Sequence, residues 1–488
     1  MAPVARGPPA RQHHGVRRLA IALVCAVALL AMSGTALGHA YLSSSAPAAD
    51  STVEASPGLV SMRFSEPIEL LRSEDADVVD SDGNGVSSGP ARLGADNRVL
   101  EIPLRPRLVD GTYTVRYKVV GADSHVIPSV FVFGVGIPED ELAAPFFAGD
   151  GSGGPTETGV WGTSSRFLEI VGLGGLVGLL AFRWLMWGRA MRTLDGVAQA
   201  EREAVLSWGR DAFWIGFGVL ALGAMLAEGY LLIVHSASVL GTGVWDTLRD
   251  AAGISQVLAD TRFGSLVQLR GALLFGLFAI GAVLFIREYG GSGTPKPAQA
   301  TGPLLPSLAM AVLLGSVLGG IAAQGHASVA PLAPLQIGAH MAHVVAVAVW
   351  MTGLALVAVV HVRLPKIAPA AGPALAARVL SRFSRVALVA VSLVIVTGVA
   401  RAVAELSDPA QLWDTSYGRS ILFKIALLAP IALIALYNRR IVAAVSRIAR
   451  PNAPTLRLVR RTASAELALS LVVVLIASIL VAQVPAGG

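Results

Sequence analysis

Two histidines and an aspartate in the first 125 residues have the types and spacing of a metal site. His39 follows the small residues of ALG, where an exported precursor would be cut. Cleavage after Gly38 would make His39 the first residue, and an N-terminal histidine offers its α-amine and its Nδ1 to one metal ion. Asp123 and His125 are two residues apart, so in an extended segment both side chains project to the same side. Nitrogen donors with one carboxylate suit tetragonal Cu(II).

Glu66, in FSEPIEL, is a further candidate acid for this site. The alternatives are that His39 reaches the N-terminus by an accident of cleavage and that His125 is a solvated loop residue. The two histidines together favour the metal site. The only cysteine, Cys25, lies in the apolar run ahead of the cut, so the mature chain would have no thiolate ligand.

Composition predicts an integral membrane protein in a lipid bilayer. Of 488 residues, 54% are hydrophobic and 14% are charged, and the mean hydropathy is +0.65. Residues 1–38 combine arginines, an apolar run and small residues, which is typical of a signal peptide. From Trp161 on, apolar stretches of roughly 20 residues predict about eight membrane helices. They lie near 164–188, 211–235, 265–287, 303–323, 338–361, 383–405, 420–438 and 464–484.

Residues 39–137 have the pattern of strands. In TYTVRYKV, residues 112–119, apolar and polar residues alternate with the period of a half-buried strand. About seven such runs predict a β-sandwich. Residues 138–160 are acidic and rich in Gly and Pro, and we expect a linker there. The predicted fold is therefore mixed: an all-β sandwich, then an all-α polytopic membrane domain over residues 161–488.

Basic residues predict the orientation. Arg and Lys concentrate in the loops after the first, third, fifth and seventh spans, whereas the opposite loops hold only Arg249, Arg262 and Arg419. The positive-inside rule then places the sandwich and the C-terminus on the outer side of the cytoplasmic membrane.

This orientation puts four histidines of the membrane domain on the outer side: His235, His326, His340 and His343. His340 and His343 are three residues apart and share a helix face. We expect the four to gather at a single face and to accept a metal ion. Capping and interfacial roles are the alternative.

Glu228 lies on the His235 face about 10 Å deeper. Because charged groups in a span usually line a pathway, Glu228 and Glu169 are candidates for a route through the membrane. Arg270 and Lys424 could instead neutralise them as structural pairs. Met225 and Met351 would lie near the bilayer midplane, where thioethers could pass Cu(I) onward, although such methionines usually serve packing.

The chain resembles two copper-related families. The first domain contains HAYLSSSAPAADSTVEASPGLVSMRFSEPIEL and GTYTVRYKVVGADSHVIPSVFVFGV, and with them it resembles the CopC copper-binding domain, a Greek-key sandwich. The membrane part contains SRFSRVALVAVSLVIVTGVARA and TSYGRSILFKIALLAPIALIALYNRR, and it resembles the CopD family. The whole is similar to a CopC and CopD fusion of the YcnJ type.

The resemblance implies that His39, Asp123 and His125 bind Cu(II), with Glu66 at the position of a further acid. Many CopC domains also have a methionine-rich Cu(I) loop, but Met62 is the only methionine between residues 39 and 137. Since thioethers select Cu(I), we expect this domain to bind Cu(II) alone.

The predicted function is copper homeostasis without enzymatic activity. The sandwich would capture Cu(II) and pass it to the outer histidines for transport, with uptake as the predicted direction, although resistance also fits the family. The linker would keep donor and acceptor within about 30 Å. No GxxxxGK[ST] sequence is present, so ATP is not the expected drive. Copper ions are the expected partners, with an extracytoplasmic copper chaperone or reductase and no nucleic acid.

Two other functions fit the sequence less well than transport. In a haem-b electron-transfer protein acting as a cupric reductase, histidines on facing helices would hold haem; only His361 lies near the inner face, so no transmembrane pair of haems would form. An oxidase would need coordination space that Asp123 would occupy.

The first prediction concerns the cut. N-terminal sequencing of the mature protein should begin HAYLS, and one extra residue ahead of His39 should strongly weaken Cu(II) binding because it removes the amine chelate. Unchanged Cu(II) affinity in the extended protein would exclude the amine as a ligand.

Overall fold

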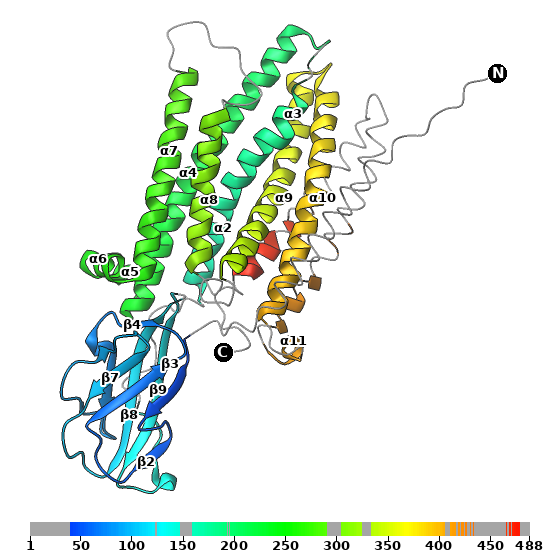
Figure 1. The fold of residues 1–488 in the computed structure, drawn as a ribbon. Coiled ribbons are helices and arrows are strands. Elements are labelled where there is room, and N and C mark those ends of the chain that lie inside the picture. Colours follow the sequence, from blue (N-terminus) through cyan, green and yellow to red (C-terminus); the bar gives the residue numbers. More distant parts are fainter. Residues whose placement is uncertain are drawn as a thin grey trace.

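The structure is a computed structural model in which a β-sandwich lies at one end of a bundle of long helices (Figure 1). It describes residues 40–122, 124–146, 159–192, 194, 196–289, 304–324, 333–405 and 410–415, with scattered positions between 418 and 478.

Two sheets form the sandwich. The first has the order β1 (Leu42–Ala46), β3 (Leu59–Phe64), β7 (Val99–Pro103) and β6 (Arg92–Leu93). The second has the order β2 (Ser51–Val53), β9 (Val126–Val135), β8 (Gly111–Gly121) and β4 (Ile68–Glu69), and β5 (Ala76–Val79) also pairs with β8. The described residues thus contain more strands than the predicted seven or so, because strands of two or three residues leave no periodic pattern.

The sandwich core follows the predicted alternation. Along β8, Tyr113, Val115, Tyr117 and Val119 are buried, and they face buried residues of the first sheet such as Met62. On the other face of β8, the hydroxyls of Thr112 and Thr114 accept hydrogen bonds from the backbone amides of Ala143 and Phe146, both at 2.9 Å. The start of the expected linker, which includes the turn η2 (Glu139–Glu141), therefore packs on the sandwich as far as Phe146.

Six helices in the described part of the chain are long and apolar enough to cross a bilayer. The first is α2 (Val160–Ala181), which continues through a π-helical segment, η3 (Phe182–Trp187), into α3 (Gly188–Ala190). The others are α4 (Gln199–Leu240), α7 (Arg262–Tyr289), α8 (Leu304–Gln324), α9 (Ala333–Ile367) and α10 (Gly372–Glu405). They confirm the first six predicted spans. The predicted spans at 420–438 and 464–484 lie mostly outside the described residues.

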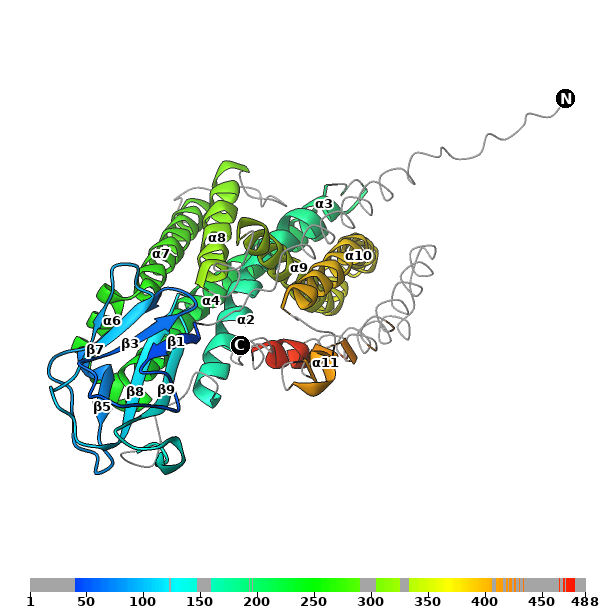
Figure 2. The same ribbon diagram turned by 60° about the horizontal axis from the view of Figure 1, so that its bottom comes forward.

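The short elements complete the description. They are η1 (Ser73–Asp75) in the sandwich, α5 (Val244–Thr247) and α6 (Ala251–Asp260) between α4 and α7, and α11 (Gln411–Asp414) after α10. The sandwich contacts the end of the bundle at which α4 and α8 finish and α7 begins, which is called the sandwich end below (Figures 1 and 2).

Aromatic side chains gather at two levels of the bundle. Near the sandwich end, Trp161 lies 6.5 Å from Tyr230 and 6.1 Å from Trp245, between ring centroids. Toward the opposite end, Trp187 lies 5.7 Å from Trp208. Tryptophan and tyrosine prefer the membrane–water interface, so these two levels are consistent with the two boundaries of a bilayer.

Helix α2 packs through glycines against α4 and α9. The position of a Cβ at Gly172 would lie 3.1 Å from the Cα of Ala224, and at Gly178 it would lie 2.5 Å from the carbonyl oxygen of Ala348. Small residues let helix backbones approach closely inside a bilayer. The glycines of α2 therefore set its distance from both neighbours.

A second prediction follows from this packing. Gly178→Ala should destabilise the protein by about 1–3 kcal/mol, because the added methyl group overlaps α9. Gly223→Ala is the matched control, since nothing lies within 4 Å of a Cβ at that position of α4. Thermal unfolding of the purified protein in detergent measures both. Equal unfolding temperatures for the two variants would show that α2 and α9 can move apart without loss of stability.

Candidate functional site

The predicted Cu(II) ligands come from three segments of the sandwich. His39 and Asp123 lie outside the described residues. Close to His39, the backbone amide of Tyr41 donates to Ser65 Oγ at 3.1 Å, and the amide of Ser65 donates to the carbonyl of Tyr41 at 3.0 Å. The chain two residues after His39 is thus fixed beside the residue that precedes Glu66.

Glu66 in turn lies near the loop that contains His125. Strand β4 begins two residues after Glu66, which is 8% exposed, and its first residue, Ile68, pairs with Gly121 of β8. The amide of Gly121 donates to the carbonyl of His125 at 2.9 Å and closes the loop between β8 and β9. Residues 65–69, 121–122 and 124–126 therefore form one end of the sandwich, called the loop end below.

The loop end contacts the membrane domain through Arg262, the first residue of α7. Its backbone amide donates to Glu69 Oε1 at 2.9 Å. Its guanidinium donates to the carbonyl of Ala122, the residue before Asp123, and to the carbonyl of Ala323 near the end of α8 at 3.0 Å. The Arg262 residue thus joins the loop of the sandwich that contains His125 to α7 and α8.

Two further hydrogen bonds cross the same contact. Arg72 Nη2 donates to the carbonyl of Leu240 at 3.1 Å, and Gln256 Nε2 donates to the carbonyl of Leu71 at 3.4 Å. The sequence predicted a donor tethered by the linker. In the structure the sandwich also rests directly on α4, α6 and α7.

Apolar packing surrounds these polar contacts. Val120 and Val126 of the sandwich share a cluster with Leu231, Leu240 and Phe263 of the helices. Burial raises the pKa of Glu69, although the Arg262 amide and charge act in the opposite direction. Desolvation thus outweighs the pairing at Glu69, and burial of the apolar cluster adds to the stability of the contact.

His235 lies within this contact region. Its ring stacks on Phe263 with 3.6 Å between centroids, and it is 2% exposed. Phe263 belongs to the cluster that includes Val126, the residue after His125. His235 is therefore the described histidine of the membrane domain that adjoins the contact with the loop end.

His340 and His343 instead face α10. Arg401 Nη1 donates to His340 Nδ1 at 2.7 Å. A guanidinium only donates, so Nδ1 carries the lone pair and the hydrogen of the neutral ring lies on Nε2. A metal ion would have to displace either that hydrogen or Arg401. This arrangement disfavours His340 as a ligand.

His343 has the opposite arrangement. Its Nδ1 lies 2.8 Å from Thr397 Oγ1, which also lies 2.6 Å from the carbonyl of Leu393. The single hydroxyl hydrogen goes to that carbonyl, so Thr397 accepts from His343 Nδ1–H and the lone pair lies on Nε2. Metal-binding histidines commonly donate from one ring nitrogen and bind the metal through the other.

The remaining candidates do not assemble into one site. Glu228 and Glu169 pair with Arg270, as expected for a structural pair, while Lys424 and His326 lie outside the described residues. Met225 and Met351 pack in two different apolar clusters. Over the described ranges, no three His, Cys, Asp or Glu side chains are placed to hold one metal ion. The single histidine face expected from sequence is therefore not seen for the three described histidines.

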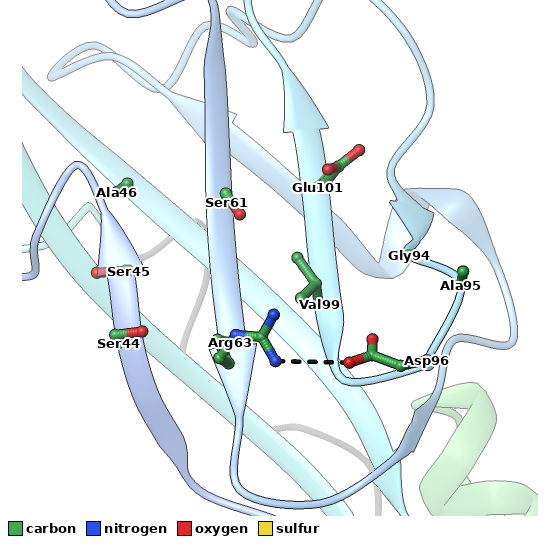
Figure 3. Close-up of a pocket in the computed structure, with 10 residues that line it drawn as sticks. All are labelled: Ser44, Ser45, Ala46, Ser61, Arg63, Gly94, Ala95, Asp96, Val99 and Glu101. Atoms are coloured by element: carbon green, nitrogen blue, oxygen red, sulfur yellow. Dashed lines mark hydrogen bonds and ion pairs between the residues drawn. The ribbon is translucent and has the colours of Figure 1, made fainter.

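An open pocket of about 520 Å³ lies on the first sheet (Figure 3). Its lining residue Asp96 precedes Asn97, whose carbonyl accepts a hydrogen bond from the amide of Ile68 in the loop end at 2.7 Å. It is lined by Ser44, Ser61, Glu101 and neighbours, and an exposed ion pair joins Arg63 to Asp96 across it at 3.5 Å. None of the predicted ligands lines it.

Comparison with known families identifies the two parts. Residues 42–136 match the CopC domain, and residues 377–480 match copper resistance protein D, CopD. The chain is a CopC–CopD fusion. The CopD match includes Thr397 and Arg401, the α10 partners of the two histidines.

One relative covers most of the chain and others cover the first domain alone. The copper transport protein CutJ of Bacillus subtilis strain 168 is 24% identical over 401 residues, which are 82% of this chain and 67% of CutJ. Protein YobA of Escherichia coli K12 is 34% identical over 98 residues, 20% of this chain and 78% of YobA. The solved CopC from Methylosinus trichosporium OB3b is 28% identical, spans 22% of this chain and all of that one, and gives a TM-score of 0.18.

Sequence reasoning missed the residues that connect these elements. The sequence offered one indication for Arg262, because it is one of only three arginines in the loops that the positive-inside rule places outside. Thr397 and Arg401 had none, because their importance depends on the side of α10 that faces α9.

A third prediction tests the contact of the CopC domain. Arg262→Ala should raise amide hydrogen exchange in residues 68–72 and 120–126 by about tenfold to a hundredfold, because a hydrogen bond to a charged group contributes about 1.5–3 kcal/mol. Arg249→Ala is the matched control, since Arg249 is exposed and pairs locally, with Asp246 of α5 three residues earlier. Unchanged exchange in Arg262→Ala would mean that the apolar cluster alone fixes the domain.

Proposed function

We propose that this CopC–CopD protein transports copper across the membrane that its helices span, in the direction of uptake. The CopC domain captures Cu(II) through His39, Asp123 and His125, with Glu66 beside them, and releases copper to the helices beneath it. Both matched families are copper-related, and the relative that spans most of the chain is named a copper transport protein. Both lines support copper as the cargo.

One observation carries the proposal: the loop end of the CopC domain rests on the sandwich end of the helices. The segments next to all four candidate ligands meet there, and Arg262 binds the carbonyl adjacent to Asp123. A donor in this position delivers its ion without releasing it to solvent. His235 adjoins the same contact and is the first acceptor on this route.

The hydrogen bonds of α9 support His343 as the next ligand. Thr397 orients its ring with the lone pair on Nε2, whereas Arg401 holds His340 in the other tautomer and places a positive charge beside it. Copper, a cation, is thus favoured at His343 and disfavoured at His340. The basic loops of the sequence support placing the CopC domain outside the cytoplasm.

A fourth prediction tests this function with the full chain in proteoliposomes. Radioactive copper supplied on the CopC side should accumulate inside, with and without a reductant to define the oxidation state that crosses. His343→Ala should lower the flux at least about tenfold, because it removes a ligand, and His340→Ala should change it far less. Electron paramagnetic resonance should show Cu(II) on the CopC domain of both variants.

Three results would contradict this mechanism. Absence of flux in the wild type would exclude transport. Equal losses in His340→Ala and His343→Ala would exclude the tautomer argument. A Soret band in the purified protein that disappears when both histidines are replaced would identify a haem site instead.

A further inference from the structure

Arg270 of α7 is completely buried among four membrane helices. Its Nη2 donates to Glu228 Oε2 of α4 at 2.8 Å, and its Nη1 lies 3.3 Å from Glu169 Oε1 of α2. Nη1 also donates to Gln324 Oε1 at the end of α8. Arg270 has 0% exposure and both glutamates have 5%. The cluster therefore has almost no access to solvent.

The charges of this cluster do not balance if both carboxyls are ionised. One guanidinium and two carboxylates leave a net charge of −1 among apolar helices, and no other charged group of the described residues contacts them. An uncompensated buried charge costs several kcal/mol. Glu228 Oε1 and Arg270 Nε, within the described part of the chain, also have no hydrogen-bond partner. Adding one proton to the carboxyl pair removes the excess charge.

We infer that Glu169 and Glu228 share one exchangeable proton and that this proton is coupled to copper movement, an inference that rests on the proposed transport function. The proton belongs to the pair, because the two carboxyls interact through one guanidinium. It is taken from water on the CopC side and returned to water on the opposite side. No covalent bond other than O–H forms or breaks.

Copper is a poor occupant of the same site. A metal ion bound by either carboxylate would lie next to the guanidinium, which is within 3.3 Å of both. Carboxylate oxygens also suit hard cations better than Cu(I). Glu228, which the sequence placed on the copper route, is thus assigned to the proton instead.

The end of α8 links the proton pair to the CopC domain. Ala323 accepts a hydrogen bond from Arg262, whose guanidinium also holds the loop before Asp123. The next residue, Gln324, accepts from Arg270. A change in the contact between the loop end and the helices can therefore be passed from Ala323 to Gln324, and from there to Arg270.

Infrared spectroscopy of the full-length protein tests the proton site without relying on transport. At neutral pH the wild type should show a buried protonated carboxyl that disappears on alkaline titration. Glu228→Gln and Glu169→Gln should each abolish it, because the remaining carboxylate is then neutralised by Arg270. Glu203→Gln, at an exposed site on α4, is the control that should retain it. The proposal fails if the wild type lacks this band or if the band survives both substitutions.

Copper flux tests the coupling. An acidic medium on the CopC side should increase wild-type flux, a protonophore should cancel the increase, and Glu228→Gln should not respond to the gradient. Wild-type flux that ignores the gradient would overturn the coupling and leave the transport function standing. A protonated pair in a protein without flux would overturn the transport function and the coupling, and leave the proton site standing.

Discussion

The arrangement of the helices depends on one guanidinium buried in a membrane domain. Arg270 connects α7 to α2, α4 and α8, and Gly320 of α8 makes the space, since a Cβ there would lie 3.0 Å from Arg270 Cγ. Removing one partner of a buried ion pair costs about 3–5 kcal/mol, because the other charge stays behind. The positions of these four helices therefore depend on one another, and two of them, α4 and α7, also contact the CopC domain.

Helix α7 contacts both the CopC domain and the buried charged cluster of the membrane domain. Arg262 and Arg270 are separated by about 12 Å along the helix, so one side chain holds the CopC loop end and the other holds the carboxyl pair. Both arginines also bind the last turn of α8. The candidate copper ligands, His235 and the carboxyl pair thus depend on a small set of contacts, although they come from separate segments of the sequence.

The sequence predicted features that depend on local periodicity and missed those that depend on distant partners. The alternation along β8 and six of the apolar spans are confirmed, because period and length determine them. The short strands and the contact of the CopC domain were missed, since neither leaves a pattern within one segment. Spacing placed His340 and His343 on one face, but their different chemistry arises from Arg401 and Thr397, which only the packing of α10 against α9 reveals. The ligand roles of His39, Glu66, Asp123 and His125 stay predictions.

The order of the cluster residues along the chain has a consequence for biogenesis. Glu169 and Glu228 are synthesised before Arg270, and Gln324 comes last. A charged residue at the centre of a membrane helix costs about 2.5–3.5 kcal/mol on insertion when it is alone. The first two helices therefore enter the bilayer with acidic groups that lack a counter-ion, and they gain it when α7 arrives. During co-translational insertion, the carboxyl groups of Glu169 and Glu228 can therefore pair with Arg270 only after α7 has left the translocon.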